Sequence, residues 1–163
     1  MDQGFTLIEL LIVVAVIAIL AAIAFVALNP LARFQDARNA RRWADVNMIL
    51  AAIKLDQIDN GGSYLSEISS LTADVYYQIG AGESCADTCS NPTVTLQSAC
   101  ADLSSLVNEY YLPGVPIDSN ASGASADETR YYISRHSGGA ITIGSCSEEI
   151  GSNSSIPNIS VKR

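Results

Sequence analysis

Basic residues are scarce in this sequence, and none occurs among the first 32 residues. The 163 residues include 9 Lys and Arg against 17 Asp and Glu, which gives a formal net charge of −8. Residues 1–59 hold six acids and five bases, whereas residues 60–163 hold eleven acids and four bases. Because an acidic domain repels phosphate backbones, DNA is not an expected partner.

Histidine occurs only once, at His136, and cysteine is missing from the first 84 residues. An enzyme needs a pocket in which ionisable groups converge, and no motif among the acids or around His136 indicates one. We therefore expect neither an enzyme nor a bound cofactor, and we expect His136 to lie in a turn. A length of 163 residues predicts about one domain.

A long apolar run dominates the N-terminal region. Leu10–Leu28 is nineteen residues of Ala, Val, Ile, Leu and Phe only, and about 18 such residues indicate a membrane span. Three alternatives are a cleaved signal peptide, a permanent anchor, and a segment that is processed but retained. A signal peptide has a basic start and an apolar stretch of roughly 7–15 residues, so the first alternative fits poorly.

An acidic residue interrupts this apolar segment at Glu9, four residues after Phe5 and therefore on the same helical face. A carboxylate at membrane depth costs several kcal/mol unless it has a partner, and it marks a functional site. The surrounding residues, Gly4-Phe5-Thr6-Leu7-Ile8-Glu9-Leu10, resemble the class III signal of type IV pilins and type II secretion pseudopilins. The close resemblance covers about the first 28 residues.

This resemblance implies a processing and assembly pathway. A prepilin peptidase would cleave after Gly4 and methylate the new N-terminus at Phe5, while the apolar segment stays as a membrane anchor and later as a filament core. Glu9 matches the family's conserved glutamate. The ammonium group at Phe5 would pair with Glu9 of a neighbouring subunit, because pairing favours the charged form of both groups. The pair would set the axial register of a helical homo-oligomer.

Two departures from the family pattern concern the leader and the helix. The leader Met1–Gly4 has no basic residue, whereas the family's leader usually carries one. The family usually has a proline within the apolar helix, but here the first proline is Pro30. Since proline removes a hydrogen bond and clashes with the preceding turn, we expect a helix break at Pro30.

The next segment has no glycine or further proline before the stop signal Asn60-Gly61-Gly62. Its apolar positions at helical spacing predict a stripe that packs on a sheet; they are Val46, Ile49, Leu50 and Ile53. Residues 5–59 would span roughly 80 Å as a helix. We expect an α+β lollipop, with the C-terminal half of a long hydrophobic helix packed on a small antiparallel sheet.

The resulting divisions are a leader (1–4), a transmembrane or filament-core helix (5–29), an amphipathic half of the stalk helix (30–60) and an extracellular head (61–163). Four arginines follow the apolar run: Arg33, Arg38, Arg41 and Arg42. They form either a solvated face with ordinary surface pairs, such as Arg41 with Asp45, or contacts to acidic patches of neighbouring subunits. The positive-inside rule alone would place them in the cytoplasm.

In the head, residues 130–135 and 140–143 alternate about a glycine-containing turn, which predicts a β-hairpin. One set of its alternating side chains is expected to face the helical stripe; the set is Tyr131, Ile133, Ile141 and Ile143, or else the residues that alternate with them. Residues 101–111 predict a short helix, and residues 74–79 a strand or an extended loop. Residues 148–163 are expected to form a loose tail with one edge strand near 159–161.

The cysteines are even in number, at Cys85, Cys89, Cys100 and Cys146, and allow three pairings. Their spacing does not match a zinc ribbon. Two disulfides predict an oxidising compartment, which outweighs the arginine cluster and places the head outside the cytoplasm. No metal is expected. A weak calcium candidate is the set of oxygen ligands Asp118, Asn120, Asp127 and Glu128, although a solvated turn fits these residues better.

These observations favour the major subunit of a type IV pilus that serves adhesion or surface motility. The precursor would lie in the cell membrane and the mature chain in an extracellular fibre. The alternatives are a pseudopilin of a type II secretion system, a minor pilin and, least favoured, an extracellular domain on a permanent anchor.

Overall fold

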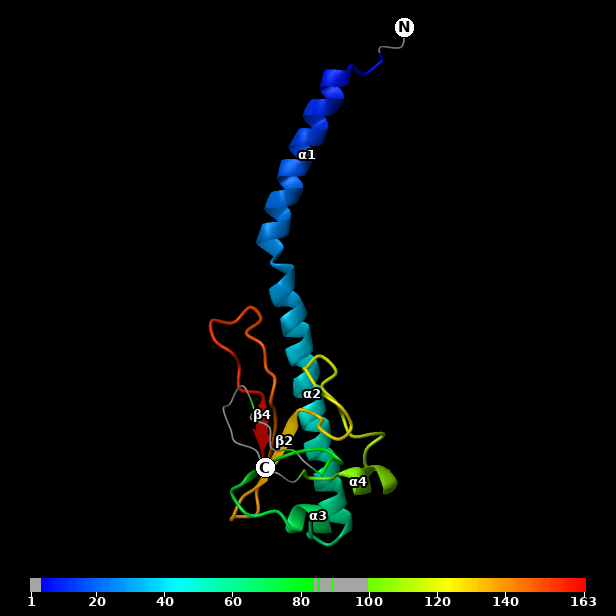
Figure 1. The fold of residues 1–163 in the computed structure, drawn as a ribbon, viewed down its shortest axis with the longest axis vertical. Coiled ribbons are helices and arrows are strands. Elements are labelled where there is room, and N and C mark those ends of the chain that lie inside the picture. The colour runs from blue at the N-terminus through cyan, green and yellow to red at the C-terminus, as the bar shows by residue number, and fades with distance from the viewer. Residues whose placement is uncertain (1–3, 84, 86–88, 90–99) are drawn as a thin grey trace.

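The computed structural model describes residues 4–83, 85, 89 and 100–163. Its elements form a long bent stalk and a small head at the end of the stalk far from the N-terminus (Figure 1). In chain order they are α1 (Leu7–Leu28), α2 (Pro30–Asp59), α3 (Ser66–Ser69), β1 (Tyr76–Gln78), α4 (Ser104–Asn108), β2 (Tyr131–Arg135), β3 (Ile141–Ser145) and β4 (Ser160–Lys162).

The head contains one antiparallel sheet with the strand order β1-β2-β3-β4. Strands β2 and β3 form the predicted hairpin, in which Ile133 lies opposite Ile143. His136 lies in the turn of this hairpin. Its Nδ1 is 2.9 Å from Oδ1 of Asp74, which precedes β1, and its Nε2 is 2.7 Å from Oγ1 of Thr142 in β3. The segment left open between strand and loop contains β1, and β4 pairs with β3 at the far edge.

The core lies between α2 and this sheet. The stripe predicted on α2 is buried, and so are the four predicted side chains of the hairpin. Together they belong to one apolar cluster that also includes residues of the connecting segments. Burying an Ile or Val side chain contributes roughly 1.5–3 kcal/mol, so this contact fixes the head on the stalk. The expected α+β lollipop is confirmed.

Two local predictions need correction. The helix expected over residues 101–111 is shorter, because α4 covers only Ser104–Asn108. The tail is not loose: Gly151 and Ser152 donate backbone hydrogen bonds to Gln35 and Asp36 of α2. The tail is poor in large apolar residues, which suggested a loose segment, but polar hydrogen bonds to the stalk hold it in place. We call residues 148–152 the strap.

Candidate functional site

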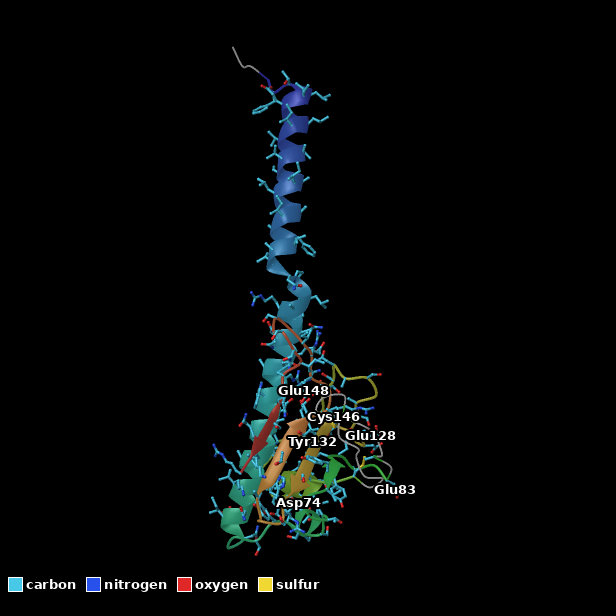
Figure 2. The ribbon with its side chains drawn as sticks, turned by 90° about the vertical axis from the view of Figure 1, so that its left-hand side faces the viewer. Asp74, Glu83, Glu128, Tyr132, Cys146 and Glu148 are labelled. Atoms are coloured by element: carbon cyan, nitrogen blue, oxygen red, sulfur yellow. A yellow bond between two sulfur atoms is a disulfide. The ribbon has the colours of Figure 1, made fainter. Side chains whose placement is uncertain are left out.

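Helix α1 extends from the N-terminal end of α2, away from the head (Figure 1). None of its 22 residues is buried, and Figure 2 shows its side chains projecting on all sides. A helix of this length is about 33 Å long, close to the thickness of the hydrocarbon core of a bilayer. By length and composition, the helix that begins at Leu7 could cross a membrane.

A capping box begins α1. The side chain of Thr6 accepts a hydrogen bond from the Glu9 backbone N–H at 3.3 Å. In return, Glu9 Oε2 accepts hydrogen bonds from the Thr6 backbone N–H at 2.8 Å and from the Thr6 hydroxyl at 2.6 Å. These bonds satisfy backbone donors that have no partner within the helix.

The role of Thr6 was missed in the sequence, although the signal was present. A Thr followed three residues later by Glu, directly before an apolar run, is the pattern of a capping box. From the sequence, Glu9 was interpreted as a partner for a charge on another subunit, and no capping role was expected for it. Among the hydrogen bonds of the described residues, only Oε2 of Glu9 is used. Because a carboxylate accepts several bonds through both oxygens, Oε1 stays available for a cation.

The residues in front of the capping box are open. Phe5 is 85% exposed, and apart from Gly4 and its two chain neighbours, no atom of the described chain lies within 4 Å of the place where a Cβ on Gly4 would stand. A peptidase therefore meets no folded obstacle at the Gly4–Phe5 bond.

The comparison with known families agrees with this segment. Residues 1–25 match the prokaryotic N-terminal methylation motif. This is the class III signal of type IV pilins and pseudopilins. No curated protein and no solved structure matches the chain. Pilins and pseudopilins, the proteins that carry this motif, are structural subunits. The motif also fits a precursor that is anchored in the membrane and processed by a prepilin peptidase.

The break after the methylation motif lies at Asn29, which has a left-handed conformation with φ 40° and ψ 67°. Asn tolerates this conformation better than most residues. Pro30 is the first residue of α2, where its missing N–H costs no helical hydrogen bond. Asn29 thus ends α1 and precedes α2, and the two helices follow one another with a bend (Figure 1).

A buried ionic cluster holds the head to the first half of α2. Arg42 is 2% exposed, and its guanidinium donates to Asp118 Oδ2 at 2.6 Å, to Glu149 Oε2 at 2.9 Å and to Asn39 Oδ1 at 2.9 Å. Arg38 donates to the two oxygens of Glu149 at 2.6 and 2.5 Å. The hydrogen bonds from Arg38 lower the pKa of the Glu149 carboxyl.

Both interpretations of the arginine cluster are therefore wrong for Arg42, which is buried and pairs within its own chain. Arg38 also pairs within its own chain, through a half-buried contact with Glu149. Arg33 and Arg41 are exposed. Asp45, expected to pair with Arg41, accepts a hydrogen bond from the hydroxyl of Tyr131 at 2.6 Å instead. Sequence spacing reports only neighbours along the helix, so it could not reveal partners on loops more than 70 residues away.

The strap also contains a buried carboxyl group, Glu148, which is 5% exposed. Its Oε1 accepts a hydrogen bond from the backbone N–H of Ile159 at 3.3 Å, whereas Oε2 has no hydrogen-bond partner among the described residues. Burial raises the pKa of Glu148 to about 7. Figure 2 shows Glu148 at the end of the head nearer to α1, with Asp74 at the opposite end.

Of the four residues of the weak calcium candidate, Asp118 and Glu128 have side chains that contact arginines, and Asn120 and Asp127 make backbone hydrogen bonds. Asp118 binds Arg42, and the backbone N–H of Asn120 donates to Asp118 Oδ1 at 3.3 Å. Glu128 lies 3.4 Å from Arg130, and the Asp127 carbonyl accepts a hydrogen bond from the Gly82 N–H. In the part of the chain that the structure describes, no three His, Cys, Asp or Glu side chains form a group that could hold a metal ion.

The cysteines form two pairs, Cys85 with Cys100 and Cys89 with Cys146, whose Cα atoms are 5.2 and 4.3 Å apart. The first pair joins two cysteines that are 15 positions apart, and the second joins Cys89, which lies between them in the sequence, to the residue that follows β3. The sequence predicted two disulfides but left three pairings open, and the structure selects this one. Most of the residues between Cys85 and Cys100 lie outside the described part of the chain.

Proposed function

We propose that this chain is the major subunit of a type IV pilus. The precursor is cleaved after Gly4 and methylated at Phe5, and residues 5–29 are retained as the segment that first anchors and then assembles the subunit. The observation that carries this proposal is the methylation motif on a helix with no buried residue. So large an apolar surface needs lipid or neighbouring helices around it.

The geometry at the start of α1 supports our proposal that a charge pair between subunits sets their register. After cleavage, the ammonium group of Phe5 enters a region of low dielectric, where an unpaired charge is expensive. Oε1 of Glu9 on a neighbouring subunit can accept this ammonium while Oε2 continues to cap its own helix. The pair repeats along the helical homo-oligomer and fixes the axial stagger of each added subunit.

The properties of the head support our proposal that it forms the outer, extracellular part of the fibre. Two disulfides suit an oxidising compartment, and the acidic residues of 60–163 give the head a hydrophilic surface. Arg42 and Glu149 keep the head rigid on α2, so that force on the head reaches the filament core. Adhesion or surface motility is the role that such a fibre serves.

The second candidate is a pseudopilin of a type II secretion system or a minor pilin, because the methylation motif is common to all of them. A calcium site in the loop at Asp118 would favour a secretion pseudopilin. Asp118 is instead hydrogen-bonded to Arg42, and this contact supports our proposal of a pilus. An extracellular domain on a permanent anchor is the least favoured alternative, because no motif among the acids or around His136 indicates a catalytic site.

The test is the location of the mature chain in its own cells. Cells are sheared, and the fibre and membrane fractions are compared by quantitative mass spectrometry and by immunogold labelling. A major pilin is abundant in the sheared fraction and labels fibres along their whole length. Label restricted to rare points on fibres would indicate a minor pilin, and a chain confined to membranes would indicate a pseudopilin.

A further inference from the structure

The head contains Asn-X-Ser triplets whose middle residue is not proline. They begin at Asn120, Asn153 and Asn158. In exported proteins this triplet is the acceptor of N-linked glycosylation, provided that it lies in an accessible surface loop. The three triplets lie in different structural settings, which separates usable acceptors from an unusable one.

The first triplet lies in a tight turn beside the ionic cluster. The backbone N–H of Ala121 donates to the Asp118 carbonyl at 2.9 Å, and this closes the turn around Asn120. Asn120 and Ser122 are both exposed. No hydrogen bond in the described chain involves the side-chain amide of Asn120, so its nitrogen is free to react.

The second triplet lies at the end of the strap. The backbone N–H of Asn153 donates to the Ile150 carbonyl at 3.1 Å and closes another turn. The residues Asn153, Ser154 and Ser155 are all exposed. In the described chain, the side-chain amide of Asn153 also has no hydrogen-bond partner.

The third triplet is built into the sheet. Ile159, its middle residue, is buried, and its N–H donates to Glu148 Oε1. Ser160 belongs to β4 and lies opposite Gly144 of β3. A glycosylating enzyme would have to remove this segment from the sheet to bring Asn158 and the Ser160 hydroxyl into its active site.

We propose that Asn120 and Asn153 carry N-linked glycans, and that Asn158 does not. The inference rests on export of the head, which is part of the proposed function. The amide nitrogen attacks C1 of a sugar that is linked to a lipid diphosphate. A C1–N bond forms, the bond between C1 and the diphosphate oxygen breaks with its electron pair on the diphosphate, and the amide loses one proton. No oxidation or reduction takes place.

Both acceptors lie at the same end of the head. Asp118, two residues before Asn120, binds Arg42, and Ser152, directly before Asn153, binds Asp36. Six residues on a helix correspond to about 9 Å along its axis. Figure 1 shows both loops extending along α2 toward α1. The two glycans therefore form a hydrophilic collar at the place where the head meets the stalk.

The experiment is glycopeptide mapping of the full chain purified from its own cells, with electron-transfer fragmentation to locate each modification. We expect sugar mass on Asn120 and Asn153 and an unmodified Asn158. Ser122→Ala should remove the glycan from Asn120 alone, whereas Ser122→Thr should keep it, because Thr also supplies the hydroxyl of the triplet. Asn158→Gln is the matched control and should leave the pattern of glycans unchanged.

The same digest contains the N-terminal peptide and therefore separates the two proposals. Bare Asn120 and Asn153 in a chain that begins at Phe5 would overturn the glycan proposal and leave the proposed function intact. Sugar on serine only would also overturn it. Both glycans on a chain that still begins at Met1 would support glycosylation and contradict the proposed processing.

Discussion

The Arg42 guanidinium and the Asp118 carboxylate form a buried ion pair with a 2.6 Å contact between residues that are 76 positions apart. Arg42 is 2% and Asp118 4% exposed, so both charges have lost most of their water. Such a pair stabilises a fold only when hydrogen bonds satisfy the remaining donors, and Asn39 and Glu149 supply acceptors for Arg42 here. The pair links the stalk to a loop of the head.

Removing one partner of this pair should cost more than removing both. Arg42→Met alone leaves the buried Asp118 carboxylate uncompensated and should lower the free energy of unfolding by about 3–5 kcal/mol. Asp118→Leu should cost less, because Arg42 keeps its contact with the Glu149 carboxylate. The double variant Arg42→Met/Asp118→Leu should recover a large part of this loss. Chemical denaturation of the full chain in detergent measures the difference. The neighbouring exposed Arg41→Met is the control and should stay within about 0.5 kcal/mol. A double variant as unstable as the sum of the single ones would contradict this account.

The buried carboxyl of Glu148 predicts a specific pH dependence. Burial raises its pKa in the folded chain to about 7, above the value of about 4.3 in an unfolded chain. The folded state therefore holds the proton more tightly, and Glu148 weakens the fold as the pH rises from about 4.3 through 7. Relative to Glu148→Gln, the free energy of unfolding of the natural chain should fall across this range, by at most about 1.4 kcal/mol for each unit of pKa difference.

Denaturation of both proteins at several pH values tests this prediction. The exposed Glu83→Gln is the matched control for replacing a carboxyl group by an amide. If the difference in free energy of unfolding between the natural chain and Glu148→Gln is constant from pH 5 to pH 8, the Glu148 carboxyl is solvated and not buried as described.

The strap depends on the close approach of Gly151 to α2. Gly151 has φ +59°, and a Cβ at this position would lie on Oδ1 of Asp36. Gly151→Ala should therefore push the strap away from α2 and break the hydrogen bond from the Ser152 N–H to Asp36. Hydrogen exchange should report at least a tenfold faster exchange of the Ser152 amide. Gly138→Ala, where nothing lies within 4 Å of the added Cβ, should leave that rate unchanged. An unchanged Ser152 amide in Gly151→Ala would mean that the strap is not held as described.

The two functions assigned to Glu9 can be separated by a single substitution. Glu9→Gln keeps a side-chain acceptor for Thr6, because Gln also serves in a capping box. It removes the charge that would meet the ammonium of Phe5. We expect normal cleavage after Gly4 but at least tenfold less chain in sheared fibres. Thr6→Val, which removes the cap and keeps the charge, should assemble better than Glu9→Gln. Normal amounts of fibre in Glu9→Gln would refute the pairing.

The sequence predicted those parts of the fold that depend on local periodicity. Helical spacing of apolar residues predicted the buried stripe that includes Val46 and Ile53. Alternation of residues with a period of two predicted the hairpin that includes Tyr131 and Ile141. The ionic cluster at Arg42 and the strap could not be predicted this way. Their partners are far apart in the chain, and a charged residue on a helix has the same local pattern whether it is solvated or paired.

The candidate site shows the same division. The methylation motif is local, so Gly4, Phe5 and Glu9 were recognised from the sequence. The capping box is equally local but was not predicted, because Glu9 was interpreted through its charge and not as an acceptor for Thr6. The loop at Asp118 suggested calcium because carboxylates close in sequence look like a ligand set. The structure assigns Asp118 to Arg42 instead.

The central claim, processing with retention of the apolar helix, is tested most directly by the intact mass and N-terminal fragmentation of the chain from sheared surface fibres. The account predicts a chain that begins with N-methylated Phe5 and retains Leu10–Leu28, with two disulfides that make it four hydrogens lighter than its reduced form. A chain that still begins at Met1, or one that has been cut after Leu28, would contradict it.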